Sequence, residues 1–204
     1  MSKRIALAVA SVAAACSSVS SGAMVTFTNS TLWGMFASSR GAATSPTNFG
    51  SYSGTYSSSL TGTSGGVQWV AAADGGVSAG PGFLSAQQGN RLLTLSLSAQ
   101  VQGIGGNFVA NGAPGLVAVP AFVTVALADG SSYVGYAASA TDFVGFYSTG
   151  AAISSVSISV SGGSASGSYY ATIGGLSFAA VPSPGAVSVM GAGMLAAGAR
   201  RRRR

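Results

Sequence analysis

The chain has 204 residues and a formal net charge of +6, but seven of its nine basic residues lie at the two ends, as Lys3, Arg4 and Arg200–Arg204. Between these ends two arginines and three aspartates remain, a formal charge of −1, which excludes the basic surface that nucleic-acid binding requires. There is no histidine, and the single cysteine is Cys16, so the body cannot carry a Ser-His-Asp or Cys-His catalytic site, a zinc ion held by histidine or cysteine, or an internal disulfide.

Residues 1–23 have the pattern of a secretory signal peptide. Two basic residues precede an apolar run, Ile5–Ala15, and small residues ending at Ala23 fit a small-x-small cleavage site. A second interpretation treats Cys16 as the lipidated cysteine of a lipoprotein signal. Either interpretation predicts export of the chain that follows.

The first part of the body predicts few regular elements. We expect Met24–Ala37 to be extended, and the Ser-, Thr- and Gly-rich residues 38–66 to form a long loop or a set of short edge strands. The anchors of this region are predicted to be aromatic: Phe49, Tyr52 and Tyr56.

A strand is predicted over Val67–Ala73, ending at Asp74 and two glycines. Residues 77–89 are predicted to be a loop with a turn at Gly80-Pro81-Gly82. Trp69 lies between apolar neighbours and is predicted to belong to the core.

Two segments alternate apolar and polar residues with the period of two that is typical of a half-buried strand, Leu93–Val101 and Ser155–Ser161. The glycines of Gly103–Gly106 are expected to interrupt the first segment with a bulge or tight turn. They do not fit a nucleotide-binding loop, because the third glycine and the following helix are absent.

The apolar run Ala121–Ala128 predicts a central strand, and Asp129-Gly130 after it predicts a hairpin. Further strands are expected at Phe143–Tyr147, Ser168–Ile173 and Leu176–Ala179. Short strands separated by Gly- and Ser-rich turns, with no helical period before Val187, predict an all-β fold. We expect one antiparallel, jelly-roll-like β-sandwich over residues 24–180.

The C-terminal residues 181–204 form a tail of three parts. Val181-Pro-Ser-Pro-Gly185 is a poor helix former because its prolines fix φ and favour extended backbone. An apolar run, Val187–Ala199, follows and is shorter than the about 17–25 residues that a spanning helix needs. The last part is a cationic cluster. It resists translocation, so we predict that it stops the transfer of the chain across the membrane and stays on the cytoplasmic side. Its members are Arg200, Arg201, Arg202, Arg203 and Arg204.

This order of parts resembles the PEP-CTERM sorting signal of exported bacterial proteins. The residues that match are the arginine cluster and those of the proline motif, Val181, Pro182, Pro184 and Gly185, while Ser183 stands where the family usually has glutamate. The resemblance implies recognition, and cleavage near the prolines, by an exosortase-like membrane transpeptidase or protease. The alternative is an ordinary tail anchor with a proline-rich linker.

Residues 92–179 resemble a β-sandwich domain common among sorted proteins of this kind. The matching segments are Gly103–Phe108, Asp129-Gly130, Phe143–Phe146 and Tyr170–Ile173. Relatives often continue the last segment with Asp-Asn, where this chain has Gly174-Gly175, so any calcium-binding role of those side chains is lost. The shared residues are turn and core residues, and they imply a fold rather than an activity.

Candidates for chemistry are few. Glycosidases use two carboxylates about 5–9.5 Å apart, and Asp129 and Asp142 are the only pair that the sequence brings near each other. Both are predicted to be turn residues, as is Asp74, and we predict no metal site and no cofactor. Tyr52 and Tyr56, four residues apart in a polar segment, are candidates for an aromatic platform that binds carbohydrate.

Together these observations predict an exported, non-catalytic protein. Its tail would hold it in the inner membrane until it is sorted to the cell surface or an extracellular polysaccharide matrix. The alternative is a carbohydrate-binding module that uses exposed aromatic residues, and a secreted hydrolase is a third, less favoured possibility because the chain lacks histidine and glutamate.

Overall fold

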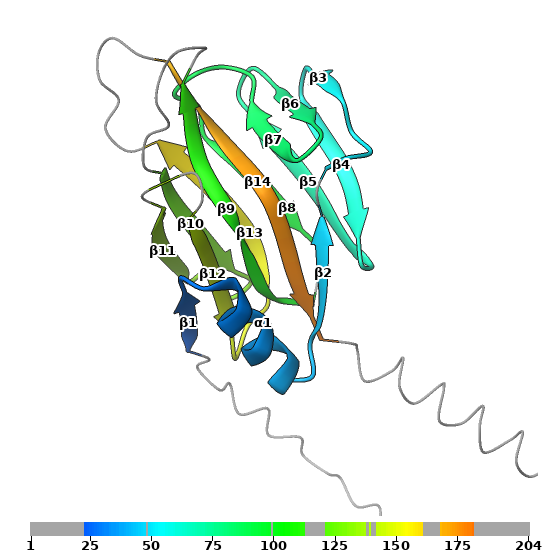
Figure 1. Ribbon diagram of the computed structural model, residues 1–204, viewed down its shortest axis with the longest axis vertical. Helices are drawn as coiled ribbons and strands as arrows, with labels where there is room; N and C mark the ends of the chain where they lie inside the picture. Colours follow the sequence, from blue (N-terminus) through cyan, green and yellow to red (C-terminus); the bar gives the residue numbers. More distant parts are fainter. Residues whose placement is uncertain are drawn as a thin grey trace, which may run out of the picture.

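The computed structural model describes residues 23–181 except 48, 99, 113–120, 138, 140–141 and 161–167. Two antiparallel sheets and one helix make up this part of the chain (Figure 1). The eight-stranded sheet contains β1 (Met24–Phe27), β2 (Ala43–Thr47), β3 (Gly54–Tyr56), β6 (Val77–Gly80), β7 (Phe83–Ala86), β9 (Val101–Gly112), β12 (Phe143–Ser148) and β14 (Tyr169–Ala180). The six-stranded sheet contains β4 (Ser59–Ser64), β5 (Val67–Ala73), β8 (Leu93–Leu97), β10 (Ala121–Leu127), β11 (Ser132–Ala137) and β13 (Ile153–Val160).

The strand orders are β1-β12-β9-β14-β7-β6-β3 and β11-β10-β13-β8-β5-β4. β2 also pairs with β14, along the residues that follow those paired with β7. The main core lies between the sheets. Its largest fully buried members are aromatic and aliphatic side chains from both sheets and the segment before β3: Trp69, Phe49, Phe108, Phe146, Phe178, Leu84, Leu93, Leu95, Ile104, Ile153, Ile158 and Ile173. The expected all-β, two-sheet architecture is therefore confirmed, as are the core position of Trp69 and the anchoring role of Phe49.

The alternating segments form strands in the predicted sense. Leu93 and Leu95 of β8 face the core, as do Val156 and Ile158 of β13, and the two strands pair directly. The first segment ends as a strand at Leu97, earlier than predicted. β10 lies between β11 and β13, and its hairpin with β11 turns at Asp129-Gly130 as expected.

The region from Met24 to Ala37 corrects the prediction of extended chain. It is extended only over β1, and then forms helix α1 (Ser30–Ser39). Asn29 caps the helix, because its side chain accepts a hydrogen bond from the backbone N–H of Leu32 at 3.0 Å. The sequence carried this signal, since Asn precedes a segment whose Leu, Met and Ala favour helix.

Two further expectations are wrong. Residues 77–89 are not a loop, because β6 and β7 pair as a hairpin around the predicted turn at Pro81. The two strands expected near the end are one strand, β14, which continues through a bulge at Gly175. The Ser- and Gly-rich residues 38–66 do contain short strands, and β3 and β4 end their sheets as predicted.

The glycines of Gly103–Gly106 do not interrupt a strand but lie inside β9. Gly105 pairs with Gly145 of β12, and together they form a floor without side chains on the outer face of the eight-stranded sheet. A β carbon at Gly145 would lie 2.7 Å from the Trp33 ring and 2.7 Å from the Phe143 ring. The missing side chains are therefore required by the helix that packs above them.

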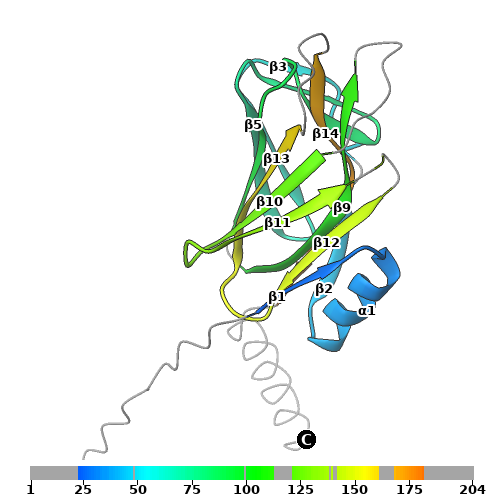
Figure 2. The ribbon, with the colours of Figure 1, turned by 90° about the vertical axis from the view of Figure 1, so that its left-hand side faces the viewer.

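Helix α1 covers this face through a second, smaller core (Figure 2). Trp33 is 3% exposed, and its indole N–H donates a hydrogen bond to the Phe146 carbonyl oxygen at 3.1 Å. The other members of this cluster are Ala37, Ala42, Tyr147 and Ala179, with Phe27, Phe36, Phe143 and Val181 packed against it.

Tyr147 makes the stability of this cluster depend on pH. Its ring meets Phe36 edge-on at 5.2 Å, and burial raises the pKa of its phenol above the ordinary value, an effect that Arg40 partly opposes. Because the pKa is raised in the folded state, the protonated phenol contributes to the free energy of unfolding. This contribution is complete below about pH 10 and is lost as the pH rises through the folded-state pKa. We expect the wild type to lose more stability than Tyr147→Phe above about pH 10 in urea denaturation. Identical pH profiles would contradict this assignment.

Candidate functional site

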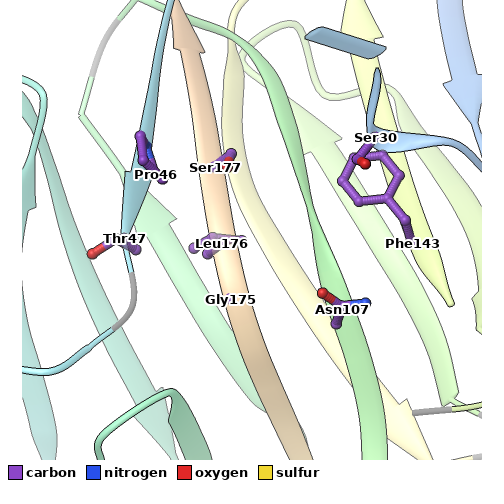
Figure 3. Close-up of a pocket in the computed structure, with 8 residues that line it drawn as sticks. All are labelled: Ser30, Pro46, Thr47, Asn107, Phe143, Gly175, Leu176 and Ser177. Carbon is purple, nitrogen blue, oxygen red and sulfur yellow. The ribbon is translucent and has the colours of Figure 1, made fainter. Parts of the chain in front are cut away.

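A groove on the outer face of the eight-stranded sheet is the first candidate site. It has a volume of about 380 Å³ and lies beside the start of α1 (Figure 3). Pro46 and Thr47 of β2 lie on one side, and Ser30 and Phe143 lie on the other. The strands between them contribute Asn107, Gly175, Leu176 and Ser177.

The groove follows from an irregularity in β14. Gly174 pairs with Phe83 at the start of β7, and Leu176 pairs with Thr47 at the end of β2. The register with β9 also shifts between Gly174 and Leu176, so Gly175 has no residue opposite it in the pairing with any of these three strands. Its φ of +66° is a conformation that glycine adopts readily, which explains this residue type at the position.

The side chains of the groove are uncharged. The amide nitrogen of Asn107 donates a hydrogen bond to the Asp142 carbonyl oxygen at 3.2 Å, which fixes its orientation. The Phe143 ring packs against Trp33, with ring centroids 6.0 Å apart. The hydroxyls of Ser30, Thr47 and Ser177 complete a lining suited to a small neutral ligand, and no lining side chain can act as a general acid or base at neutral pH.

Each of the three aspartates of the body has a hydrogen-bond or ion-pair partner. Asp129 accepts hydrogen bonds from the Ser131 backbone N–H at 3.0 Å and hydroxyl at 2.7 Å, which lowers its pKa. Asp142 accepts the same two kinds of bond from Ser139, at 3.0 and 2.7 Å. Asp74 forms an exposed ion pair with Arg91 at 3.0 Å. The predicted turn roles of all three aspartates are confirmed, since Asp74 lies in the turn that the Gly76 N–H closes on the Ala73 carbonyl oxygen.

A second concavity, of about 440 Å³, lies beside that ion pair. Its lining comes from the end of β5 and from the residues leading into and along β8: Ala72, Ala73, Asp74, Asn90, Arg91, Leu92 and Thr94. Asp74 and Arg91 neutralise each other at its rim. Within the part of the chain that the structure describes, no three carboxylate or cysteine side chains gather as a metal site would require.

Tyr52 and Tyr56 do not form a shared, open aromatic platform. Tyr52 precedes β3, and its ring meets the buried Trp69 ring at 5.4 Å and 69°. Both tyrosines are half-buried and pack against the main core. The carbohydrate-binding assignment of these two residues stays a prediction.

Comparison with known proteins adds no relative. No family, no curated protein and no solved structure matches the chain.

The sorting motif lies at the edge of the described residues. Val181 is half-buried against the cluster around Trp33, directly after β14. Among the residues that are described, no helix is long and apolar enough to cross a membrane. The signal segment 1–22 and the rest of the tail lie outside the described residues, so their predicted roles stay predictions. The tail residues concerned are Pro182, Pro184 and Gly185 of the motif and Arg200, Arg201, Arg202, Arg203 and Arg204 of the cluster.

The sequence interpretation missed one pair of exposed aromatic residues. Phe122 of β10 and Tyr136 of β11 are cross-strand partners and are 40% and 52% exposed. Phe122 lies in an apolar run that is typical of a buried strand, so only the alternation within that run could have indicated its outward position. Trp33 was also missed as the anchor of a helix.

Proposed function

We propose that the chain is an exported, non-catalytic β-sandwich protein that its C-terminal tail sorts to the cell surface or an extracellular polysaccharide matrix. The observation that carries this proposal is the order of parts in residues 181–204, namely the two prolines, the apolar run and the arginine cluster. The signal-like residues 1–23 support it. The proposal includes a jelly-roll-like order of strands in the body, a signal helix before the body and a hydrophobic helix after it.

The position of Val181 supports a role for the tail close to a membrane. Ala180 still pairs with Ala43 of β2, and Val181 packs on the small core, so the proline motif begins at the surface of the body. Residues 182–186 can span at most about 18 Å when extended. With the apolar run in the inner membrane, the body would therefore stay close to the bilayer until an exosortase-like enzyme cleaves the tail.

The chemistry of the body supports a non-catalytic role. Each of its three carboxylates bonds within a turn or to an arginine, and the groove beside Gly175 is lined by neutral groups. Both features suit a protein with a structural or ligand-binding role. No observation favours the hydrolase alternative.

Processing at the prolines can be tested by intact mass. We expect the protein released into the medium by producing cells to lack the residues beyond about Pro184, and the membrane-bound protein to retain them. The N-terminus of both forms should be Met24, whereas a lipid mass on Cys16 would indicate the lipoprotein route. An ordinary tail anchor predicts that the arginines remain in every form, and that result would remove sorting from the proposal.

Replacing all five arginines of Arg200–Arg204 with glutamine should reduce the membrane-bound precursor, because the cluster fixes the cytoplasmic side of the tail. Replacing Arg40 and Arg91, the two arginines of the body, is the matched control and should leave the precursor unchanged. Equal amounts of precursor in all three proteins, measured by fractionation and blotting, would contradict the stop-transfer role.

A further inference from the structure

The outer face of the six-stranded sheet carries no charged side chain on its described strands. Residues that alternate with the buried ones point outward from this sheet, and the pairing registers align them in rows across the strands. One row runs Val134, Thr124, Ser157, Thr94, Ala72 and Ser59, and the next runs Ser132, Ala126, Ser155, Ser96, Val70 and Thr61. We call this surface the hydroxyl face.

No described element covers the hydroxyl face. Helix α1 lies against the outer face of the other sheet, over β12 (Figure 2). The hydroxyls of Thr94 and Ser157, on neighbouring strands, approach to 3.3 Å, which shows that the rows bring hydroxyls within hydrogen-bonding distance of each other. Neighbouring strands lie about 4.8 Å apart, so the serines and threonines of the rows present donors and acceptors at strand spacing, interrupted by Val134, Ala72, Ala126 and Val70.

Exposed aromatic rings stand at one edge of this face. The centroids of Phe122 and Tyr136 are 5.3 Å apart and their planes are inclined at 52°. Val134, two residues before Tyr136 on β11, is 62% exposed and extends the apolar area. Large exposed apolar groups that gather on one face of a protein mark a binding surface.

We propose that the hydroxyl face binds a chain of neutral polysaccharide, with sugar rings seated against Phe122 and Tyr136 and sugar hydroxyls bonded to the serine and threonine rows. Sugar rings offer apolar C–H faces and many hydroxyls, which match aromatic rings and side-chain hydroxyls respectively. Because the two rings are inclined, they fit a single flexible chain better than the flat surface of a crystalline polymer.

The absence of charge on the described strands of this face selects the class of polymer. An acidic polysaccharide would bring carboxylates to strands that carry no cation. Arg91, which borders the face beside Ala72 and Thr94, is already paired with Asp74, so desolvation of the polymer's carboxylates would oppose binding. A second copy of the chain is a poorer fit, because the buried centre of a stable protein interface is more apolar than rows of serine and threonine. This proposal depends on the proposed function only in one respect, namely that the protein meets the polysaccharide in an extracellular matrix.

The test uses the full-length chain purified in mild detergent and two soluble neutral polymers, a mixed-linkage β-glucan and dextran. We expect at least one of them to retard the protein in affinity gel electrophoresis, and alginate, a polyanion, not to do so. The double variant Phe122→Ala, Tyr136→Ala should bind about tenfold more weakly or worse, since it removes both rings. Phe83→Ala is the matched control, because Phe83 is also 40% exposed but lies on β7 of the other sheet.

Binding that is lost in the double variant and kept in the Phe83 variant supports the proposal. Tyr136→Ser, at the edge strand, provides a milder variant whose weaker binding is expected even if the double variant unfolds. Failure of both neutral polymers to bind, binding of alginate alone, or unchanged binding in the variants would overturn it. Self-association that the same substitutions abolish, measured by light scattering without polymer, would assign the face to a second copy instead. None of these results depends on whether the tail is cleaved.

Discussion

Replacing Trp69 with alanine is expected to lower the free energy of unfolding by about 3–5 kcal/mol, because the substitution leaves a large cavity in a packed core. Trp69 is fully buried between the sheets. Its ring meets Phe49 edge-on at 5.7 Å and Tyr52 at 5.4 Å, so two aromatic partners lose their packing with it. Urea denaturation followed by circular dichroism measures the change.

Trp69→Phe is the matched control. The indole N–H of Trp69 has no hydrogen-bond acceptor among the described residues, so phenylalanine removes an unsatisfied donor while it keeps an aromatic ring in place. We expect this variant to lose much less stability than the alanine variant. A loss below about 1 kcal/mol for alanine would mean that the core collapses around the site and that Trp69 does not organise it.

Replacing Gly145 with valine is expected to have the second large effect, a loss of about 2–4 kcal/mol. The new side chain would occupy the space of the Trp33 and Phe143 rings, each 2.7 Å from the added β carbon. Helix α1 would have to move away from the sheet, and the hydrogen bond from Trp33 to the Phe146 carbonyl would break. Urea denaturation gives the stability, and near-ultraviolet circular dichroism reports the tryptophan environment.

Gly34→Ala separates this effect from a general intolerance of glycine replacement. A β carbon at Gly34 has open space around it, and alanine stabilises a helix interior by about 0.5–1 kcal/mol relative to glycine. We therefore expect opposite signs for the two variants. Equal destabilisation by both, or a Gly145 variant as stable as the wild type, would show that the glycine floor is not required for the helix to pack.

These two positions show where the sequence interpretation succeeded and where it did not. The burial of Trp69 followed from its apolar neighbours on a strand with alternating character. The role of Gly145 did not follow, because a glycine in a strand has the same appearance whether it forms a bulge or leaves space for a ring from another element. For the same reason Gly105, inside β9, was expected to interrupt its strand.

The candidate sites divide in a similar way. The turn roles of Asp129 and Asp142 depend on bonds to residues two or three positions away, and local sequence predicted them. Tyr52 was a candidate for an open aromatic platform with Tyr56 as well as a predicted anchor of its segment, and it packs on the buried Trp69 as an anchor would. Phe122 belongs to an apolar run that is typical of a buried strand, yet its side chain points outward beside Tyr136. Side-chain exposure depends on which face a neighbouring element covers, and that information is spread along the whole chain.

The sequence by itself determined the near-neutral charge of the body, the lack of histidine and of body cysteine, the alternation that makes β8 and β13 half-buried strands, and the hairpin at Asp129-Gly130. These are properties of composition and of residues close together in the chain. Only the tertiary structure decided that α1 packs on a glycine floor, that a groove opens beside Gly175, and that no described element covers the hydroxyl face. Each of these depends on strands that are distant in sequence and adjacent in a sheet, where the shape of one segment sets the space available to another.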